Sequence, residues 1–280
     1  ATVCLASPLR DVYKRQKQGD IMLEKLNHYR QNFSLPLTRQ KTNQTQFRFD
    51  WVDNLKELQE VQRFRAVQFS QQFGLNFEDG LDQDIYDFGC EHAVLREKWT
   101  GEIVAYTRLK LFQGHEISQS YSASEFEIVP QLSHLPNVLE IGRTCVHPRF
   151  RSGKALSILW LNLVPKVLWS MRAKYLMGCV SIHLQDNLAR AYHTHQQIQR
   201  LDSQQTIGIA SKNHFEIPRP EFSFPQDERM PKLFKMYLDM QSKLSRQAFY
   251  DETFNCLDYF VFLEVNQVAK SFVLSKRVHK

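Results

Sequence analysis

The run from residue 139 to residue 151, LEIGRTCVHPRFR, holds the side chains best suited to chemistry. Glu140 and Arg143 stand three apart among apolar residues, and Arg149 and Arg151 follow in a polar turn. In an extended strand, residues three apart point to opposite faces unless a β-bulge intervenes. If Glu140 and Arg143 serve one site, we therefore expect an irregularity in this strand, ahead of an anion-binding loop and helix.

Glu140 is the strongest candidate for a general base. Burial in an apolar strand raises the pKa of a carboxylate toward the range useful in proton transfer. Such a base could remove a proton from an amine, which is mostly protonated near neutral pH and reacts only when neutral. Backbone N–H groups freed by a bulge, around residues 144 to 146, would stabilise the oxyanion. The alternative is a structural carboxylate paired with Arg143 or Arg108.

Other charged residues allow two interpretations each. Arg143 and Arg108 would bind an acceptor carboxylate or a phosphate bidentately, or else form salt bridges across strands. Asp84 and Asp87 lie in an acidic loop and would hold the ammonium groups of a diamino acid, or else belong to a solvated loop or a helix cap. Cys145 has His147 two residues away, but a Cys–His nucleophile is the weaker reading of this pair.

The pattern along the chain indicates a single layered α+β domain over residues 51–265. An edge strand is expected near 45–51, a helix from Asp53 as N-cap to about Phe73, a hairpin at 92–97 and 103–111, and a helical turn at 122–126. A mostly apolar central strand at 138–147 precedes an amphipathic helix from Ser152, kinked at Pro165. Further elements are expected at 175–182 (strand), 187–200 (helix), 205–210 (strand), 229–244 (helix) and 257–265 (strand).

Composition excludes several classes of protein. The 280 residues carry a net charge of +6, but residues 1–16 hold +2 of it and residues 265–280 hold +4, so the body is close to neutral. Nucleic-acid binding is therefore not predicted. Five dispersed cysteines without a CxxC pair predict neither a disulfide framework nor a metal site, and a reducing cytoplasm is the simplest compartment. No apolar run is long enough for a transmembrane helix.

The two ends of the chain are set apart from the domain. Residues 1–16 resemble translated adapter sequence and are interpreted as a non-native or disordered leader, and residues 17–50 form a polar lead-in. Residues 266–280 form a basic tail, which is either solvated or in peripheral contact with an anionic membrane or an acidic carrier protein at the inner membrane face.

Nine segments in order resemble the GNAT acyltransferase superfamily, in the branch of ornithine acyltransferases, N-acyl amino acid synthases and acyl-homoserine lactone synthases. The segments are Arg65-Ala-Val-Gln-Phe69, Asp84-Ile-Tyr-Asp87 with His92, the hairpin ending Arg108-Leu, Tyr121-Ser-Ala-Ser-Glu-Phe126, Glu140-Ile-Gly-Arg143, Arg151 to Trp160, Gly178-Cys-Val-Ser181, Pro231 to Tyr237 and Phe254 to Phe260. The resemblance implies a GNAT-like fold, with a mixed central sheet flanked by helices.

The resemblance also implies roles. Glu140 and Arg143 are the expected catalytic residues, and the expected substrate-binding residues are Arg65, Phe69, Asp84, Asp87, Arg108, Cys145 and Val146. Arg65 and Phe69 would pack over the acyl entrance, although core burial is the simpler role for Phe69. The donor's phosphopantetheine would meet the loop of Arg149, Arg151, Ser152 and Gly153. No metal and no permanently bound cofactor is expected.

Two departures from the family pattern bear on the substrates. Phe150 stands where the usual pyrophosphate loop has Arg or Gln, which favours acyl carrier protein over acyl-CoA as donor. The segment 238–243 lacks an expected glycine, which leaves the acceptor open. The implied reaction moves a fatty, 3-hydroxy acyl group to the α-amine of an amino acid, ornithine first. A different acceptor, as in N-acyl amino acid or acyl-homoserine lactone synthases, and a non-catalytic GNAT-like binding protein are the alternatives.

Overall fold

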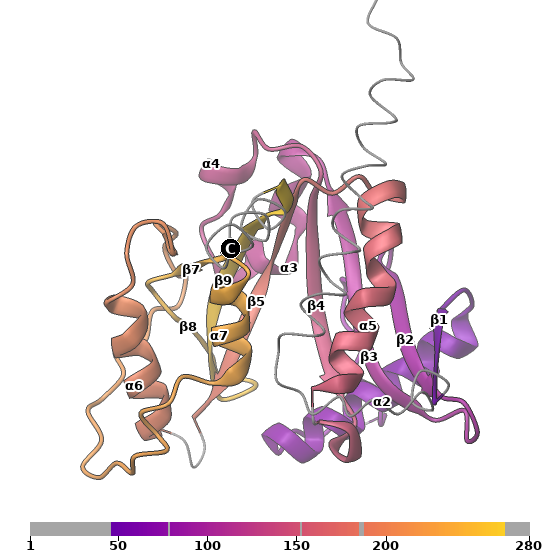
Figure 1. Ribbon diagram of the computed structural model, residues 1–280, viewed down its shortest axis with the longest axis horizontal. Helices are drawn as coiled ribbons and strands as arrows, with labels where there is room; N and C mark the ends of the chain where they lie inside the picture. The colour runs from indigo at the N-terminus through magenta and orange to yellow at the C-terminus, as the bar shows by residue number, and fades with distance from the viewer. Residues whose placement is uncertain (1–45, 78, 152, 185–187, 267–280) are drawn as a thin grey trace, which may run out of the picture.

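One sheet of nine strands organises the molecule (Figure 1). The computed structural model describes residues 46–77, 79–151, 153–184 and 188–266. The strands, in chain order, are β1 (Phe47–Trp51), β2 (Glu91–Glu97), β3 (Ile103–Phe112), β4 (Val138–Val146), β5 (Tyr175–His183), β6 (Thr206–Ile207), β7 (Lys243–Ser245), β8 (Phe249–Asp251) and β9 (Cys256–Glu264). Their spatial order is β1-β2-β3-β4-β5-β9-β7-β6, with β8 also paired to β9. Only β4–β5 and β6–β7 are parallel among these described pairs.

Helices cover both faces of this sheet. They are α2 (Leu55–Phe73), α3 (Tyr121–Glu125), α4 (Val129–Leu132), α5 (Lys154–Pro165), α6 (Leu188–Gln199) and α7 (Lys232–Asp239). On the β1–β4 half, α5 packs through Leu159 and Leu163 against Ala93 and Leu95, whereas α2 packs through Val61 against Val94 on the opposite face. This alternation along β2 is that of a strand buried on both sides. The predicted mixed sheet flanked by helices is confirmed.

Two predicted helices have different ends. The first helix is capped by Asn54 rather than Asp53, because the Asn54 side chain accepts the N–H of Glu57 at 2.9 Å. The helix predicted over 229–244 ends at Asp239, because Gln241 takes a left-handed φ of 64° that no helix continues. Leu244 then lies in β7, opposite Val261. The expected kink at Pro165 is present: α5 ends there, and a π-helical turn continues from Lys166 to Ser170.

The predicted strand at 205–210 is reduced to Thr206 and Ile207, and β8 was not foreseen at all. Both strands are too short to show an alternation of apolar and polar residues. The predicted leader (1–16), nearly all of the lead-in (17–50) and all but the first residue of the basic tail (266–280) lie outside the described residues.

The strands β4 and β5 diverge in the middle of the sheet, and the candidate active site lies where they separate. Their pairing covers Val138 to Glu140 against Tyr175 to Met177, after which β4 runs on to Val146 beside β3 alone. Figure 1 shows the two strands diverging below their paired ends. At the fork, a Cβ on Gly178 would lie 2.4 Å from the Ile141 carbonyl oxygen, so only glycine allows this approach.

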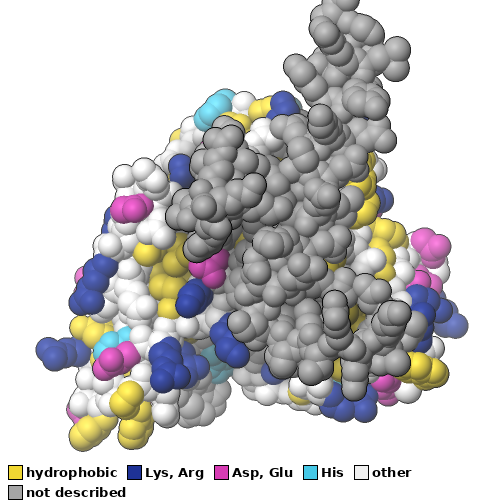
Figure 2. Space-filling model, viewed as in Figure 1, with side chains coloured by type: hydrophobic (Ala, Val, Ile, Leu, Met, Phe, Trp, Pro, Cys, Tyr) yellow, Lys and Arg dark blue, Asp and Glu magenta, His cyan; other side chains and the backbone are white. Residues whose placement is uncertain are grey.

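The described surface carries both signs of charge. Lys and Arg side chains are interspersed with Asp and Glu on the part of the face that Figure 2 shows in colour. In the described part of the chain, no helix is both long enough and apolar enough to cross a membrane.

Candidate active site

Glu140 lies at the last paired position of β4, where the strand begins to diverge from β5. Its partly buried carboxylate accepts the backbone N–H of Tyr121 at 3.1 Å and that of Ser122 at 2.7 Å. These N–H groups belong to the first turn of α3, so a side chain of β4 caps the N-terminus of this separate helix. The carboxylate is thereby fixed in one orientation at the fork.

Burial dominates the electrostatics of Glu140. Desolvation raises the pKa of its carboxyl group above the ordinary value, although hydrogen bonds from Ser122 and Tyr121 oppose the shift. A carboxylate with a raised pKa is a better proton acceptor than an exposed glutamate. The sequence-based alternative was a salt bridge with Arg143 or Arg108. Among the described residues, both of these guanidinium groups instead pair with acids of the 82–87 loop.

The predicted irregularity in β4 is present at Arg143. Gly142 pairs with Arg108 and Cys145 with Tyr106, so two residues of β4, Arg143 and Thr144, face the single Thr107 of β3. Arg143 has a φ of 51°, the left-handed region that bulges use. The Thr107 and Thr144 hydroxyls hydrogen-bond each other at 2.8 Å across the bulge.

At the bulge, the Arg143 side chain lies among three aromatic rings. The guanidinium carbon of Arg143 lies 5.4 Å from the centre of the Tyr121 ring and 5.1 Å from that of Phe254, and Phe69 lies at 5.9 Å. Its Nη2 donates to Asp84 Oδ2 at 3.0 Å. Glu140 and Arg143 therefore both contact Tyr121, one at its backbone and one at its ring, although they make no direct pair.

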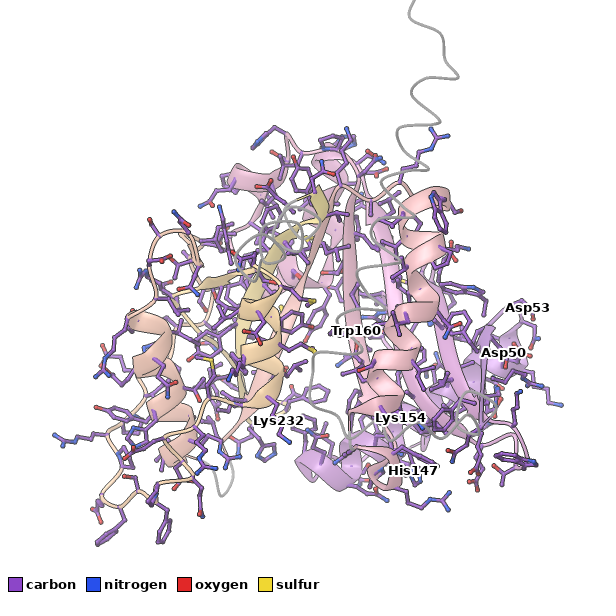
Figure 3. The ribbon with its side chains drawn as sticks, in the orientation of Figure 1. Asp50, Asp53, His147, Lys154, Trp160 and Lys232 are labelled. Atoms are coloured by element: carbon purple, nitrogen blue, oxygen red, sulfur yellow. The ribbon has the colours of Figure 1, made fainter. Side chains whose placement is uncertain are left out.

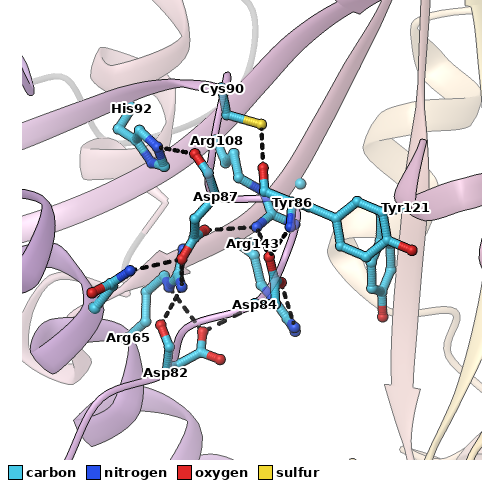
Figure 4. Close-up of polar contacts among 12 residues, drawn as sticks. Arg65, Asp82, Asp84, Tyr86, Asp87, Cys90, His92, Arg108, Tyr121 and Arg143 are labelled. Carbon is cyan, nitrogen blue, oxygen red and sulfur yellow. Dashed lines mark hydrogen bonds and ion pairs between the residues drawn. The ribbon is translucent and has the colours of Figure 1, made fainter. Parts of the chain in front are cut away.

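Behind Arg143 the acidic loop and three arginines form a buried network (Figure 4). Asp87 accepts Arg65 Nη1 and Arg108 Nη1, each at 2.7 Å. Arg108 also donates to Asp84 at 2.6 Å, and Arg65 Nε pairs with Asp82 at 2.8 Å. The arginines hold the pKa values of Asp84 and Asp87 below their ordinary range despite burial. This network ties α2, the loop, β3 and the bulge of β4 into one unit.

The network changes the interpretation of two predicted substrate contacts. The Arg65 side chain is 0% exposed and supports the loop from within the core, and its predicted place at the acyl entrance stays a prediction. The Asp87 side chain is 1% exposed and takes bonds from Arg65, Arg108 and Gln62, so its oxygens are already occupied. Asp84 is more accessible, and its predicted contact with the acceptor stays a prediction, as does that of Arg108.

Cys145 and Val146 continue β4 beyond the bulge. Cys145 is buried in the cluster beneath α2, and burial raises the pKa of its thiol to about 12, so a Cys–His nucleophile has no support. His147 is turned away to accept the N–H of Arg149 at 3.2 Å. Val146 pairs with Ala105 of β3.

The predicted donor loop leads from β4 into α5. Arg149 is exposed and pairs with Glu102 at 2.7 Å, while Arg151 Nε donates to the Val146 carbonyl at 3.0 Å. Gly153 precedes α5 with a φ of 92°, a conformation that favours glycine. Ser152 lies outside the described residues. Figure 3 shows His147 and Lys154 together at this end of β4 and α5, where the helix presents its first N–H groups.

Sequence reasoning did not assign chemistry to Tyr121, Glu125 or Asp258. Tyr121 joins the surroundings of Glu140 and Arg143, while Glu125 and Asp258 are buried carboxylates close to it. The signal was in the sequence, since the segments Tyr121–Phe126 and Phe254–Phe260 were singled out by resemblance. The sequence alone does not show that these segments meet, because α3 and β9 lie more than a hundred residues from each other along the chain.

A family model matches the part of the chain that holds the candidate site. Residues 63–161 match the family model described as Acetyltransferase (GNAT) domain. The match runs from α2 into α5 and agrees with the mixed, helix-flanked sheet.

More specifically, the chain resembles curated L-ornithine N(alpha)-acyltransferases. The one from Rhodobacter capsulatus is 26% identical over 242 residues, covering 77% of this chain and 88% of the relative. The one from Brucella abortus is 22% identical over 239 residues, covering 77% and 83%.

Two solved structures are also similar to the chain, at low identity. An N-acyl amino acid synthase from uncultured soil microbes is 11% identical, covers 79% of this chain and 92% of its own, and has a TM-score of 0.43. A CoA-dependent acyl-homoserine lactone synthase is 12% identical, covers 81% and 87%, and has a TM-score of 0.43. The resemblance predicted from the sequence is confirmed.

Proposed function

We propose that the protein transfers a fatty acyl group, 3-hydroxylated in its usual donor, from phosphopantetheine to the α-amine of ornithine, giving a lyso-ornithine lipid. The observation that carries the proposal is the fixed Glu140 carboxylate at the fork of β4 and β5, with a raised pKa. The names of the curated relatives support ornithine as acceptor.

Each step has a group to perform it. Glu140 takes a proton from the α-ammonium, directly or through water, and the freed nitrogen attacks the thioester carbonyl carbon. Negative charge on the carbonyl oxygen would be met by N–H groups of the bulged part of β4, near Thr144. The C–S bond then breaks, the nitrogen loses its second proton to the leaving thiolate as the amide forms, and Glu140 releases the first proton to solvent. Arg143, beside Tyr121, is proposed to bind the acceptor carboxylate, which requires Asp84 to share the guanidinium group or to move away from it.

The donor is proposed to be acyl carrier protein, with acyl-CoA as the alternative. Phe150, in the position of a usual pyrophosphate-loop residue, packs on Phe47 and His147 with ring centres 5.6 and 5.8 Å apart. An aromatic ring held in this way offers no hydrogen bond to a diphosphate. The basic tail of residues 266–280 is proposed to help bind the acidic carrier or an anionic membrane.

The test is incubation of the purified protein with 3-hydroxyacyl carrier protein or 3-hydroxyacyl-CoA and a panel of amino acids, read by mass spectrometry. We expect N-acylornithine from the carrier-bound donor. If only another acceptor is acylated, the result would favour the activity of an N-acyl amino acid synthase or an acyl-homoserine lactone synthase over ornithine acylation. No acylated amine from any pair would contradict an enzymatic role and favour a binding protein, whose affinity for acyl carrier protein would survive Glu140→Gln.

A further inference from the structure

A second polar region lies directly beyond Tyr121. A pocket of about 300 Å³ opens between α3 and the β8–β9 hairpin, and its lining includes Tyr121, Glu125, Phe249, Tyr250 and Asp251. Glu252 adds an acid at the rim, and the described residues of the lining include no lysine or arginine. The pocket therefore combines aromatic walls with an acidic end.

Glu125 is the residue that indicates a missing partner. Its side chain lines the pocket, yet the residue is only 3% exposed, and although Tyr121, Cys179 and Asp258 lie close to its carboxyl group, its Oε2 accepts no hydrogen bond of ordinary length within the described part of the chain. A buried carboxylate oxygen without a partner is costly, and such groups are normally satisfied by a donor, an ion or a ligand.

Two more acids, Asp258 and Asp251, lie close to Glu125 and add negative charge that a cation would neutralise. Asp258 is 4% exposed, and its carboxylate lies with those of Asp251 and the Cys256 thiol in a group whose atoms are all within 4.8 Å of one another. Burial and the neighbouring Asp258 raise the pKa of Glu125 well above its ordinary value, and burial and Asp251 raise that of Asp258 to about 6. Adjacent buried carboxylates tolerate their charge only with a proton or a cation between them.

The pocket and the Glu140 carboxylate both contact the short helix α3. The N–H groups of Tyr121 and Ser122 bind the Glu140 carboxylate, and Glu125 follows Tyr121 by about one turn of the same helix, roughly 6 Å along its axis. A molecule whose α-amine lies near Glu140 would thus present a nitrogen at the end of a short aliphatic side chain to Glu125.

We propose that Glu125, with Asp258 and Asp251 behind it, binds the side-chain ammonium of the diamino acid acceptor and so selects ornithine over neutral amino acids. This inference rests on the proposed function. Tyr121, Phe249 and Tyr250 would pack on the methylenes and face the cation.

An ammonium fits the site better than a metal ion. Burial and the neighbouring Asp258 raise the pKa of the Cys256 thiol, so it stays protonated and is a poor metal ligand. The thiol also lies 3.6 Å from Asp258 Oδ1, to which it donates. The aromatic walls of the pocket supply no oxygen-rich shell of the kind that hard cations require.

The experiment measures binding by calorimetry, independently of turnover, with L-ornithine and with L-norvaline, which is ornithine without its side-chain nitrogen. The proteins are the full chain and its Glu125→Gln and Asp258→Asn variants. Glu127→Gln is the matched control, because Glu127 is exposed and lies two residues from Glu125. We expect Glu125→Gln to weaken ornithine binding about tenfold to hundredfold, as loss of a charge-assisted hydrogen bond does, and to leave norvaline binding and the control unchanged.

The outcomes separate this inference from the proposed function. Ornithine binding that is lost in Glu125→Gln supports the inference even if the wild type forms no acylated product. Ornithine binding that is equal in all variants, or a preference for norvaline in the wild type, overturns the inference even if N-acylornithine is made. Titration with Zn²⁺ or Mg²⁺ alone is the third arm: metal binding that Asp258→Asn abolishes, with ornithine binding intact, also overturns it.

Discussion

The Glu140 carboxylate and the backbone N–H of Ser122 lie 2.7 Å apart, which joins the central strand to the short helix α3. The same bond serves two purposes, because it fixes the proposed base and satisfies a helix N-terminus. A substitution at Glu140 can therefore affect both catalysis and folding. Activity reports the loss of the charge, and the free energy of unfolding reports the loss of the cap.

Glu140→Gln is expected to lower kcat by about 10²- to 10⁴-fold, the usual contribution of a general base. The glutamine oxygen still accepts one N–H of α3, so the loss in unfolding free energy should be about 1 kcal/mol or less. Steady-state kinetics and urea unfolding of the same preparations measure the two effects. Glu127→Gln serves as the control, and kcat reduced equally in both variants would exclude Glu140 as the base.

Gly178→Ala tests whether the fork of β4 and β5 needs glycine. The added Cβ would lie 2.4 Å from the Ile141 carbonyl oxygen, so the strands must move apart. We expect a destabilisation of about 1–3 kcal/mol together with loss of activity. Gly208→Ala is the matched control, because its Cβ would meet no heavy atom within 4 Å. Equal thermal stability of the two variants would show that the fork tolerates a side chain.

Much of this architecture follows from patterns within short segments. The amphipathic pattern from Ser152 predicted α5, and the two runs at 92–97 and 103–111 predicted the β2–β3 hairpin. The bulge was also expected, because Glu140 and Arg143 could serve one site only through an irregular strand. Each of these inferences concerns residues close in sequence, where local geometry limits the possibilities.

What the sequence could not supply was the choice of partners. Asp84 and Asp87 were interpreted either as contacts for a substrate ammonium or as part of a solvated loop or cap, whereas Asp87 is bound by Arg65 and Arg108 of the protein itself. Likewise, nothing local indicates that Glu125 and Asp258 approach each other. The sequence gives the charge of each residue, but only the fold determines which residues contact it.

The buried arginine network predicts acid sensitivity. Arginine partners lower the pKa values of Asp84 and Asp87, so these groups stabilise the fold above the ordinary aspartate pKa of about 3.9, and the contribution is lost as the pH falls below it. Asp87→Asn should lower the unfolding free energy at pH 7 by about 3–5 kcal/mol, because it leaves Arg65 buried without full compensation.

Urea unfolding of wild type and Asp87→Asn between pH 7 and pH 3 measures this effect. The gap between the two curves should begin to narrow as the pH falls below about 3.9, because the unfolded Asp87 then takes up a proton while the folded carboxylate, whose pKa is lower still, stays ionised. Asp53→Asn, at an exposed position outside the network, is the control. A gap between wild type and Asp87→Asn that stays constant down to pH 3 would show that Asp87 contributes packing and not charge.

Asp258 predicts the opposite dependence. Burial and Asp251 raise its pKa to about 6, above the unfolded value, so the folded state binds a proton more tightly and loses stability as the pH rises from about 4 to about 6. Asp258→Asn removes this penalty. At pH 8 the variant should gain stability relative to wild type by about 2–3 kcal/mol compared with pH 4.5. A variant that is more stable at pH 8 and yet binds ornithine poorly would show that the charge is kept for the ligand and not for the fold. An advantage of Asp258→Asn that is the same at both pH values would mean that Asp258 does not titrate in this range.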